Sequence, residues 1–364
     1  MSDALLVLAD GSVFPGMSVG ASGRADGEVV FNTSMTGYQE MLTDPSYAGQ
    51  LLVLTYPIVG NYGTDERVEE SAHIQPAGFV VREAALRPSH ELSQQSLRQY
   101  LVRRGVVAIE GVDTRAVTRR IRRAGVMPGT ITTDETAEAA VARVRAIPRY
   151  DDVNWVERVT TDHVLDWDAP GEPRTRVALL DGGVKRNIMR SLAARGCAVR
   201  VFPSASTADE LMADRPDGIV LSPGPGDPRL LDFMVGEVGR LIGKAPILGI
   251  CLGHQVAARA LGAGTFKLPF GHRGGNHPVK DLTSGHVTIT AQNHGYAVDP
   301  DGLNPAAYVS HLNLNDQTVE GIALRHEPLM TIQYHSEACP GPLDNGYIFD
   351  RFIGMMATVR GGVR

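Results

Sequence analysis

The sequence predicts an α/β protein of two domains, in which a C-terminal, doubly wound, mostly parallel sheet follows an N-terminal α+β domain. From Arg176 onward, short apolar runs alternate with segments of helical spacing, the pattern of βαβ units. Before about Val156, β-like runs separated by turn clusters are followed by helical patterns. A chain of 364 residues is also long enough to form two separate cores.

The first domain is expected to span residues 1–156. Its β-like runs are Ala4–Ala9, Glu28–Phe31, Leu51–Thr55 and Gly78–Val81. Its helical patterns are Glu91–Arg103, Thr114–Arg123 and Thr136–Ala146. The polar segment 157–175, which contains Pro170, Gly171 and Pro173, indicates a linker between the domains.

The second domain is expected to span residues 176–364. Its predicted strands are Val177–Leu180, Ala198–Phe202, Gly218–Leu221 and Ile247–Ile250. Its predicted helices are Lys185–Arg195, Asp209–Ala213, Phe233–Gly243 and Gln255–Leu261. A strand-rich region follows, with runs at Val287–Thr290, Ala307–His311, Glu320–Leu324 and Met330–Tyr334. Because sites in parallel sheets form at the carboxyl ends of strands, the loops after Leu180, after Leu221 and at Cys251 are the places to look for chemistry.

The composition narrows the class of protein. The net charge of −6 lacks the basic footprint of a nucleic-acid-binding protein. No apolar run is long enough to span a bilayer, and the first ten residues lack the basic region and cleavage site of a signal peptide. Three cysteines argue against a disulfide framework. We therefore expect a reduced, cytoplasmic enzyme with no nucleic-acid or membrane partner.

Cys251 is the strongest candidate for a catalytic residue. It stands in Gly249-Ile250-Cys251-Leu252-Gly253, directly after an apolar run and before a predicted helix. A G-x-C-x-G sequence at a strand-to-helix turn is the thiol counterpart of the nucleophile elbow. The flanking glycines permit the tight turn, and the helix N-terminus favours the reactive thiolate. The pattern predicts a covalent cysteine enzyme.

A cysteine nucleophile needs a general base and an oxyanion hole. His335 ends a strand-like run, and Glu337 could accept a hydrogen bond from its imidazole and fix the tautomer. The backbone N–H of Leu252 and the glycine-containing loop 222–228 are candidates for stabilising the oxyanion.

Other kinds of functional site have weaker support in the sequence. The chain has no G-x-x-x-x-G-K-[ST] phosphate loop. Cys251-x-x-His254 could belong to a metal site, but no second paired motif accompanies it, so no metal is expected. Cys197 is expected to pack in the core as a small apolar residue, and Cys339 has no neighbour in the sequence that would activate it. His272, His277 and His286 lie in a glycine-rich, turn-rich stretch and are expected to be structural. The basic cluster 119–123 is expected to be a solvated helix face or a protein contact, with an anion or RNA site as the alternative. Residues 292–296 indicate a turn that could also bind a polar substrate.

Together these residues resemble the class I glutamine amidotransferases. The resemblance lies in Ser-Pro-Gly-Pro-Gly-Asp-Pro at 222–228, Gly-Ile-Cys-Leu-Gly-His-Gln at 249–255 and His-Ser-Glu at 335–337. The first half resembles the small subunit of carbamoyl phosphate synthetase, through 31–40, 43–47 and 129–131. Within the second half, 181–187, 270–281 and 290–298 resemble the same subunit, so the likeness covers nearly the whole chain.

The resemblance implies a glutaminase in which Cys251 is the nucleophile, His335 the acid/base and Glu337 its orienting partner. It assigns the contacts with L-glutamine to Ser46, Gly224, Gly226, Leu252, Gln255, Asn293, Gly295 and Tyr296. Many relatives have Pro where this chain has Ser336 and Phe where it has Tyr296. Neither change removes a catalytic atom, but Ser336 could loosen the turn that aligns Glu337.

The resemblance further implies that the partner is a larger synthetase subunit, in a heterodimer or a higher oligomer that docks through the first domain. This chain would need no cofactor, and ATP and Mg²⁺ would bind to the large subunit. The product, carbamoyl phosphate, would serve arginine and pyrimidine biosynthesis. The alternatives are an independent cysteine hydrolase and a noncatalytic scaffold subunit.

Overall fold

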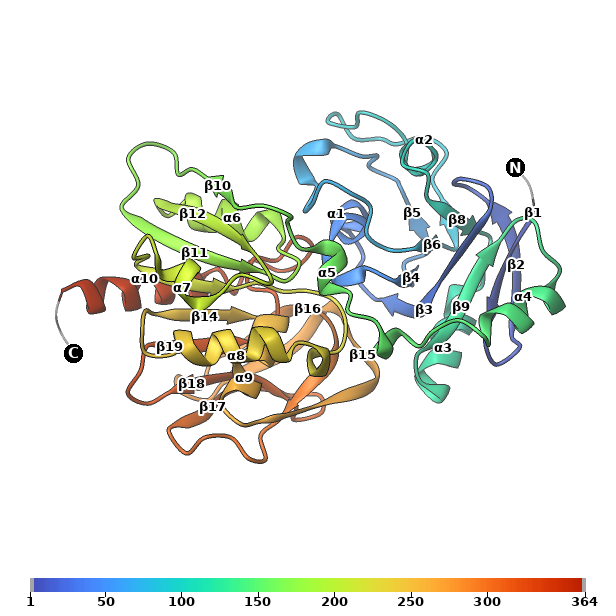
Figure 1. The fold of residues 1–364 in the computed structure, drawn as a ribbon. Helices are drawn as coiled ribbons and strands as arrows, with labels where there is room; N and C mark the ends of the chain where they lie inside the picture. Colours follow the sequence, from blue (N-terminus) through green and yellow to red (C-terminus); the bar gives the residue numbers. More distant parts are fainter. Residues whose placement is uncertain (1–2, 362–364) are drawn as a thin grey trace. The chain divides into compact units, whose positions relative to one another are not determined.

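The computed structural model describes residues 3–361, which form two compact units (Figure 1). The division falls between Val153 and Asn154, close to the boundary expected from the sequence. The segment 157–175 is not a separate linker, because it belongs to the second unit and contains α5 (Val156–Val159) and β10 (Leu165–Trp167). β10 pairs with a strand of the second unit's sheet. The backbone hydrogen bonds of this pairing stabilise the strand although turn-forming residues surround it.

The first unit contains a closed β-barrel, which the sequence does not reveal. Strands follow one another in the order β1-β2-β8-β6-β4-β3-β9, and β9 closes the barrel by pairing with β1. Their bounds are β1 Asp3–Leu8, β2 Val13–Ser18, β3 Arg24–Asn32, β4 Gln50–Leu54, β6 Gly78–Val80, β8 Val107–Glu110 and β9 Met127–Thr132. A small separate sheet joins β5 (Ile58–Val59) to β7 (Glu83–Ala84).

The helices of this unit start mostly at side-chain caps. They are α1 (Tyr38–Thr43), α2 (Leu97–Arg103), α3 (Thr114–Ala124) and α4 (Ala137–Val144), with single 3₁₀ turns at η1 (Pro45–Tyr47), η2 (Glu66–Val68) and η3 (Tyr150–Asp152). α2 begins six residues later than the pattern predicts. Ser96 and Gln99 form a reciprocal capping box there, whereas Gln95 bridges to Thr64 in extended conformation.

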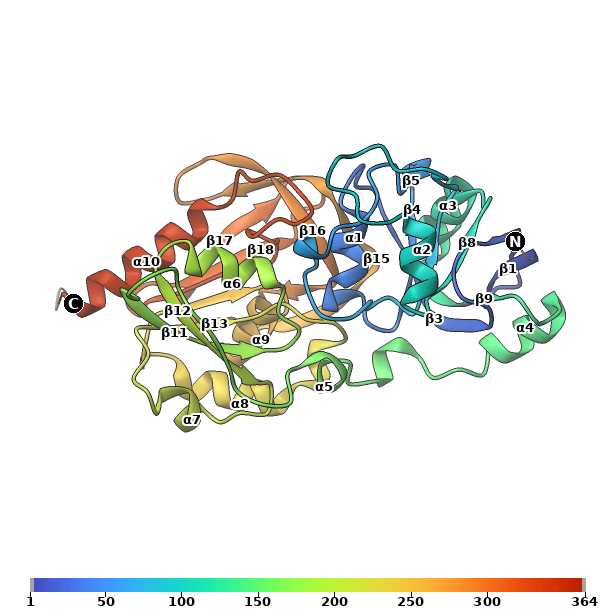
Figure 2. The same ribbon diagram turned by 90° about the horizontal axis from the view of Figure 1, so that it is seen from above.

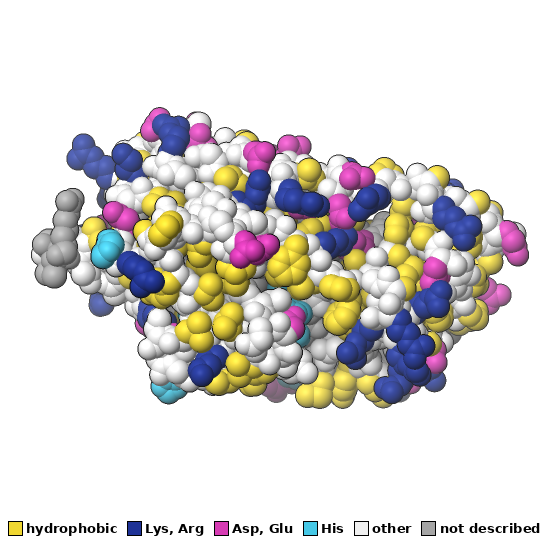
Figure 3. Space-filling model, turned by 90° about the horizontal axis from the view of Figure 1, so that it is seen from below, with side chains coloured by type: hydrophobic (Ala, Val, Ile, Leu, Met, Phe, Trp, Pro, Cys, Tyr) yellow, Lys and Arg dark blue, Asp and Glu magenta, His cyan; other side chains and the backbone are white. Residues whose placement is uncertain are grey.

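α3 presents a strongly basic outer face. Asp113 caps its N-terminus by accepting a hydrogen bond from the N–H of Ala116, and Val117 and Ile121 are buried. The arginines of this helix are exposed: Arg115, Arg119, Arg120, Arg122 and Arg123. Figure 3 shows Lys and Arg side chains gathered on the face of the molecule that is seen from below. The solvated-face interpretation of 119–123 fits this exposure.

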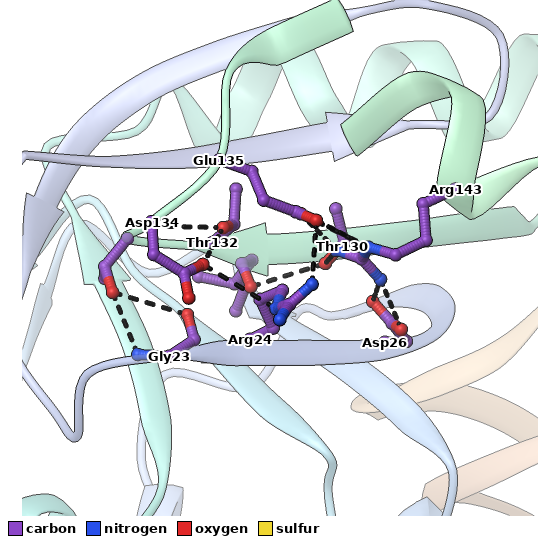
Figure 4. Close-up of polar contacts among 10 residues, drawn as sticks. Gly23, Arg24, Asp26, Thr130, Thr132, Asp134, Glu135 and Arg143 are labelled. Atoms are coloured by element: carbon purple, nitrogen blue, oxygen red, sulfur yellow. Dashed lines mark hydrogen bonds and ion pairs between the residues drawn. The ribbon is translucent and has the colours of Figure 1, made fainter. Parts of the chain in front are cut away.

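α4 is held to the barrel by a network of ion pairs (Figure 4). The guanidinium of Arg143 reaches Asp26 on β3 at 2.5 Å and Glu135 at 2.6 Å. Arg24 pairs with Glu135 at 2.9 Å and with Asp134 at 3.7 Å. The hydrogen bond from Arg143 holds the pKa of Glu135 below its usual range, although burial opposes this. The network connects α4 to β3 and to the turn that follows β9.

Replacing Arg143 with Ala is expected to lower the free energy of unfolding by about 1 kcal/mol, at the upper end of the range for solvent-accessible ion pairs, because Arg143 pairs with two carboxylates at once. Chemical denaturation followed by circular dichroism would measure this. Arg149→Ala is the matched control, since the Arg149–Asp151 pair leaves the arginine 75% exposed. An equal loss in both variants would show that the network adds nothing beyond an isolated pair.

The second unit is built on a mixed sheet of the order β10-β12-β11-β13-β14-β19-β18-β16-β15-β17. β12, β11, β13, β14 and β19 run parallel, whereas the remaining pairings are antiparallel. The expectation of a mostly parallel sheet therefore holds only for the centre. The bounds are β11 Thr175–Asp181, β12 Cys197–Pro203, β13 Gly218–Leu221, β14 Ile247–Ile250, β15 Gly264–Asp281, β16 Val287–Asp299, β17 Ala307–Asn313, β18 Val319–Leu324 and β19 Leu329–Ile332.

Helices cover both faces of the parallel strands (Figures 1 and 2). They are α6 (Arg186–Ala193) and α10 (Tyr347–Arg360) on one face, and α7 (Ala208–Met212), α8 (Asp232–Leu241) and α9 (Leu252–Ala260) on the other, with the 3₁₀ turn η4 (Pro228–Leu230) before α8. Side chains alternate accordingly: Leu179 packs with the α6/α10 layer, while Leu180 packs with the α7–α9 layer. The strands are buried on both faces, which explains their continuous apolar sequence.

β15 is the largest departure from the sequence-based picture of this unit. The glycine-rich region expected to consist of turns forms a long strand that pairs with β16. The register shifts after Lys267 and after Gly274, and Gly271 has a φ of 70°. Bulges absorb the glycines, so this stretch remains part of the sheet.

Among the described residues, no helix combines the length and the hydropathy needed to cross a bilayer.

Candidate active site

Cys251 lies at the sharp turn between β14 and α9. Its N–H donates a hydrogen bond to the carbonyl of Ile332 on β19 at 2.8 Å, which continues the parallel ladder by one residue. Its backbone has φ 53° and ψ −105°, a conformation that costs a non-glycine residue about 1–3 kcal/mol. Strain of this kind is typical of a nucleophile elbow, which holds its side chain at the carboxyl edge of the sheet.

The glycines around Cys251 are required by close packing. A Cβ on Gly253 would lie 2.2 Å from the carbonyl oxygen of Leu221, and one on Gly249 would lie 2.8 Å from the oxygen of Gly253. The first turn of α9 therefore presses directly against β13. The G-x-C-x-G pattern follows from this contact as well as from the turn.

His335 and Glu337 follow β19 on the same side of the sheet. The N–H of His335 donates to the carbonyl of Ala291 at 2.9 Å, and its Nδ1 lies 2.6 Å from Glu337 Oε1. A carboxylate only accepts hydrogen bonds at neutral pH, so Nδ1 carries a proton and Nε2 is the atom available for catalysis.

Charges around His335 decide its protonation. Burial lowers the pKa of His335, but the carboxylate of Glu337 and the sulfur of Cys251 outweigh burial and raise it to about 10. Nε2 makes no hydrogen bond of ordinary geometry within the described chain. The structure thus brings together the three residues that the sequence nominates as catalytic.

Lys185 pairs with Glu337 at this site, and sequence reasoning missed it. Its Nζ lies 3.0 Å from Glu337 Oε1 and donates to the carbonyl of Ala338 at 2.6 Å. Both side chains are buried, with 2% and 0% exposed. Burial raises the pKa of Glu337, but Lys185 and His335 lower it to about 2. The signal available in the sequence was a lysine in the loop after Leu180, at the carboxyl end of a parallel strand.

The loop 222–228 lies beside the start of α9. Ser222 Oγ accepts a hydrogen bond from the N–H of Gly182 at 2.8 Å. A Cβ on Gly224 would lie 2.2 Å from the Gly182 oxygen and 2.7 Å from Leu252 Cδ2. Gly226 has a φ of 92°, in the region that favours glycine. The structure therefore places the two loop glycines and Leu252, the first residue of α9, at one edge of the sheet.

If glutamine is the substrate, as the resemblance implies, Gly224→Ala is expected to raise its KM by at least about tenfold, because the added methyl group must displace the Gly182 backbone next to Leu252. Steady-state kinetics of glutamine hydrolysis would measure this. Gly239→Ala is the matched control, since a Cβ there meets nothing within 4 Å. Unchanged kinetics in Gly224→Ala would mean that this loop does not shape the glutamine site.

β16 supplies a second side of the site. The thiol of Cys251 lies 3.8 Å from the carbonyl oxygen of Asn293. Gln255 Nε2 donates to the carbonyl of Tyr296 at 2.9 Å and to Gln333 Oε1 at 3.0 Å. A Cβ on Gly295 would lie 3.4 Å from Arg273 Nη2. Asn293 thus borders the nucleophile through its carbonyl group, and Gln255 on α9 is tied to the same strand at Tyr296.

Ser46 and His254 are also nominated from the sequence. Ser46 belongs to the first unit, where its N–H donates to Asp44 Oδ1 and its buried Oγ has no hydrogen-bond partner among the described residues. Its contact with glutamine stays a prediction. His254 points toward β19, with Nδ1 2.7 Å from Thr331 Oγ1, and burial lowers its pKa to about 3. The group of potential metal ligands found within residues 3–361 contains neither Cys251 nor His254.

The comparisons with known proteins agree with this geometry. Residues 6–131 match the family model described as carbamoyl-phosphate synthase small chain, CPSase domain, and residues 178–355 match glutamine amidotransferase class-I. The carbamoyl phosphate synthase small chain of Akkermansia muciniphila is 49% identical, over 98% of this chain and 98% of its own length. That of Syntrophotalea carbinolica is 46% identical, over 98% of both chains.

Among solved structures, a glutamine amidotransferase from Thermotoga maritima matches with a TM-score of 0.38 at 17% identity. The match covers 52% of this chain and 86% of that protein. The full-length relatives, rather than this distant structure, confirm the resemblance on which the sequence analysis relied. The chain belongs to the carbamoyl phosphate synthase small chain family.

Proposed function

We propose that this chain is the glutaminase subunit of carbamoyl phosphate synthase, and that it hydrolyses L-glutamine to glutamate and ammonia. The observation that supports this most directly is the buried series Cys251, His335, Glu337 and Lys185 at the carboxyl edge of the sheet. It occurs in a chain whose whole length matches small-chain relatives. A cysteine–imidazole pair with an orienting carboxylate is the machinery of acyl transfer.

The proposed reaction starts with the proton of Cys251 on His335, an imidazolium whose raised pKa keeps it charged at neutral pH. The thiolate adds to the side-chain carbonyl carbon of glutamine. The N–H of Leu252, with a donor from the loop 222–228, stabilises the oxyanion, and one such donor is typically worth about 10²–10³-fold in rate. His335 Nε2 then protonates the leaving nitrogen, and ammonia departs from a γ-glutamyl thioester.

Water completes the cycle. His335, now neutral at Nε2, takes a proton from water as the hydroxyl attacks the thioester carbonyl. Collapse of this second oxyanion expels the thiolate of Cys251 and releases glutamate. Glu337 keeps the imidazole oriented in both halves, and Lys185 holds Glu337 in its charged form.

We further propose that ammonia passes to a large subunit, which binds ATP and Mg²⁺ and makes carbamoyl phosphate from bicarbonate. Released into water, ammonia would be mostly protonated and no longer nucleophilic at neutral pH, which favours transfer inside a complex. The first unit, with the basic face of α3, is the proposed docking region for that subunit.

Co-purification with a candidate large subunit tests this proposal. The two chains are expected to elute as one complex, and glutamine hydrolysis is expected to increase when ATP and bicarbonate are present. Full turnover by the isolated chain, unchanged by any large subunit, would instead support an independent hydrolase. A Cys251 that resists alkylation by a glutamine-like affinity label would support a noncatalytic scaffold.

A further inference from the structure

A second group of buried ionisable side chains lies in the antiparallel half of the sheet. His272 on β15 is directly opposite His294 on β16, and Glu320 lies near the start of β18. One imidazole nitrogen from each histidine and one carboxylate oxygen all lie within 4.8 Å of one another. The exposed fractions are 7%, 5% and 0%. Three convergent groups of this kind, buried together, are unusual without a ligand.

The imidazole of His294 has a fixed tautomer. Its Nδ1 lies 2.7 Å from the carbonyl oxygen of Tyr296, which can only accept a hydrogen bond. The proton is therefore on Nδ1, and the lone pair of Nε2 faces the cluster. Nε2 is buried and has no hydrogen-bond partner among the described residues.

His272 is oriented in the same way from the opposite strand. Its Nε2 lies 2.8 Å from Asp316 Oδ2, which places the proton on Nε2. The remaining nitrogen, Nδ1, lies 3.8 Å from Glu320 Oε1 and has no hydrogen-bond partner within residues 3–361. A carboxylate that accepts from the outer nitrogen of an imidazole is the usual support of a histidine metal ligand.

Glu320 supplies the charge. Its Oε1 accepts a hydrogen bond from Asn313 Nδ2 at 2.8 Å, and its Oε2 accepts one from Gln292 Nε2 at 2.9 Å. These amides orient the carboxylate but bring no positive charge, and the side chain is fully buried. A bound cation would offset the unfavourable burial of this carboxylate.

We propose that His272, His294 and Glu320 bind a divalent transition-metal ion of the Zn²⁺ class. Two imidazoles and one carboxylate are a known ligand set for zinc and leave a fourth position open. Ligand atoms on one tetrahedral zinc lie about 3.3 Å apart, so the three side chains must close by up to about 1.5 Å. Asp316, 38% exposed, marks the route from solvent. Such a site would give His272 a role beyond the structural one expected from the sequence.

The same atoms could instead form a hydrogen-bond network without metal, if His272 Nδ1 carried the proton and donated to Glu320. Zinc binding distinguishes the two arrangements. Because the thiol of Cys251 and the ring of His335 could also bind zinc, the experiment uses the full-length chain with Cys251→Ser as its parent. This substitution removes the competing thiolate and separates the metal site from the proposed glutaminase function.

After treatment with a chelator, each protein is dialysed against Zn²⁺ and its metal content is determined by mass spectrometry. The parent is expected to retain about one Zn²⁺ per chain. His272→Gln and Glu320→Gln, each added to the parent, are expected to retain less than about a tenth of that. His286→Gln is the matched control, since His286 lies exposed between the same two strands.

Two further readouts guard against variants that fail to fold. Circular dichroism is expected to show the same secondary structure for all variants, and Zn²⁺ is expected to raise the Tm of the parent and of His286→Gln only. Co²⁺ in place of Zn²⁺ is expected to give visible absorption bands that His272→Gln abolishes. A parent that binds no Zn²⁺, or one whose zinc content is unaffected by His272→Gln and Glu320→Gln, would overturn the proposal.

Discussion

Cys251→Ser is expected to abolish glutamine-dependent synthesis of carbamoyl phosphate in the assembled complex while synthesis from added ammonium survives. A hydroxyl is a far weaker nucleophile than a thiolate, and it cannot form the ion pair with His335. The loss in kcat for glutamine hydrolysis should be at least about 10⁴-fold, as expected when the nucleophile of a catalytic unit is removed. Steady-state assays with either nitrogen source would measure both activities on one preparation.

Cys197→Ala is the matched control for this experiment. Cys197 is buried on β12, where Thr175 Oγ1 donates to its sulfur at 3.0 Å, and it belongs to the core packed against α6 and α10. Its removal should leave both activities close to normal. Loss of ammonium-dependent synthesis in Cys251→Ser would point to a failure of assembly, and full glutamine-dependent synthesis would contradict the role of Cys251.

The parts of the fold that could be predicted are those with a local signal. The βαβ region was predictable because strands buried on both faces are continuously apolar, and turn residues and caps separate them from helices. The barrel was not predictable, since β1 and β9 meet across more than a hundred residues and nothing local specifies that pairing. β10 and β15 were missed because their turn-forming residues outweigh their β-like residues in any local reading.

In the candidate site, too, the residues with a local sequence signal were predictable and the others were not. Cys251 was evident from the elbow, because the glycines on both sides reflect a turn and a helix pressed against β13. His335 and Glu337 were evident from their spacing after a strand. Lys185 was not, because its role depends on β11 and β19 ending at the same edge of the sheet. A sequence shows which side chains are reactive, but the partners that set their charge come from tertiary neighbours.

Lys185→Met should be the most destabilising substitution near the site, lowering the free energy of unfolding by about 3 kcal/mol at pH 7. The change removes the ammonium that pairs with buried Glu337 and leaves the carbonyl of Ala338 without its donor. Chemical denaturation would measure it, with Lys244→Met as the exposed-lysine control. A loss below about 1 kcal/mol would show that Lys185 contributes little to the folded state.

The pH dependence of the free energy of unfolding should reflect the same pairing of Lys185 with Glu337. Glu337 has a pKa of about 2 in the folded chain, below its ordinary 4.5, so its stabilisation is present above pH 4.5 and is lost as the pH falls toward 2. Lys185 is the largest cause that lowers this pKa, so Lys185→Met should make the loss of stability between pH 4.5 and pH 2 smaller. His335 has a raised pKa of about 10, so its contribution is complete below pH 6.5 and is lost as the pH rises through 10.

Two variants should shift the pH at which stability is lost on the alkaline side, and they should shift it in opposite directions. Lys185 lowers the pKa of His335 through like charge, so Lys185→Met should shift the loss of stability to higher pH. Glu337→Gln removes the carboxylate that raises the same pKa, so it should shift the loss to lower pH. Unfolding measured from pH 6 to 11 in both variants would test this, together with the pH profile of kcat/KM. Shifts in the same direction would contradict the opposite effects of Lys185 and Glu337 on the pKa of His335. A structural defect common to both variants would then explain them.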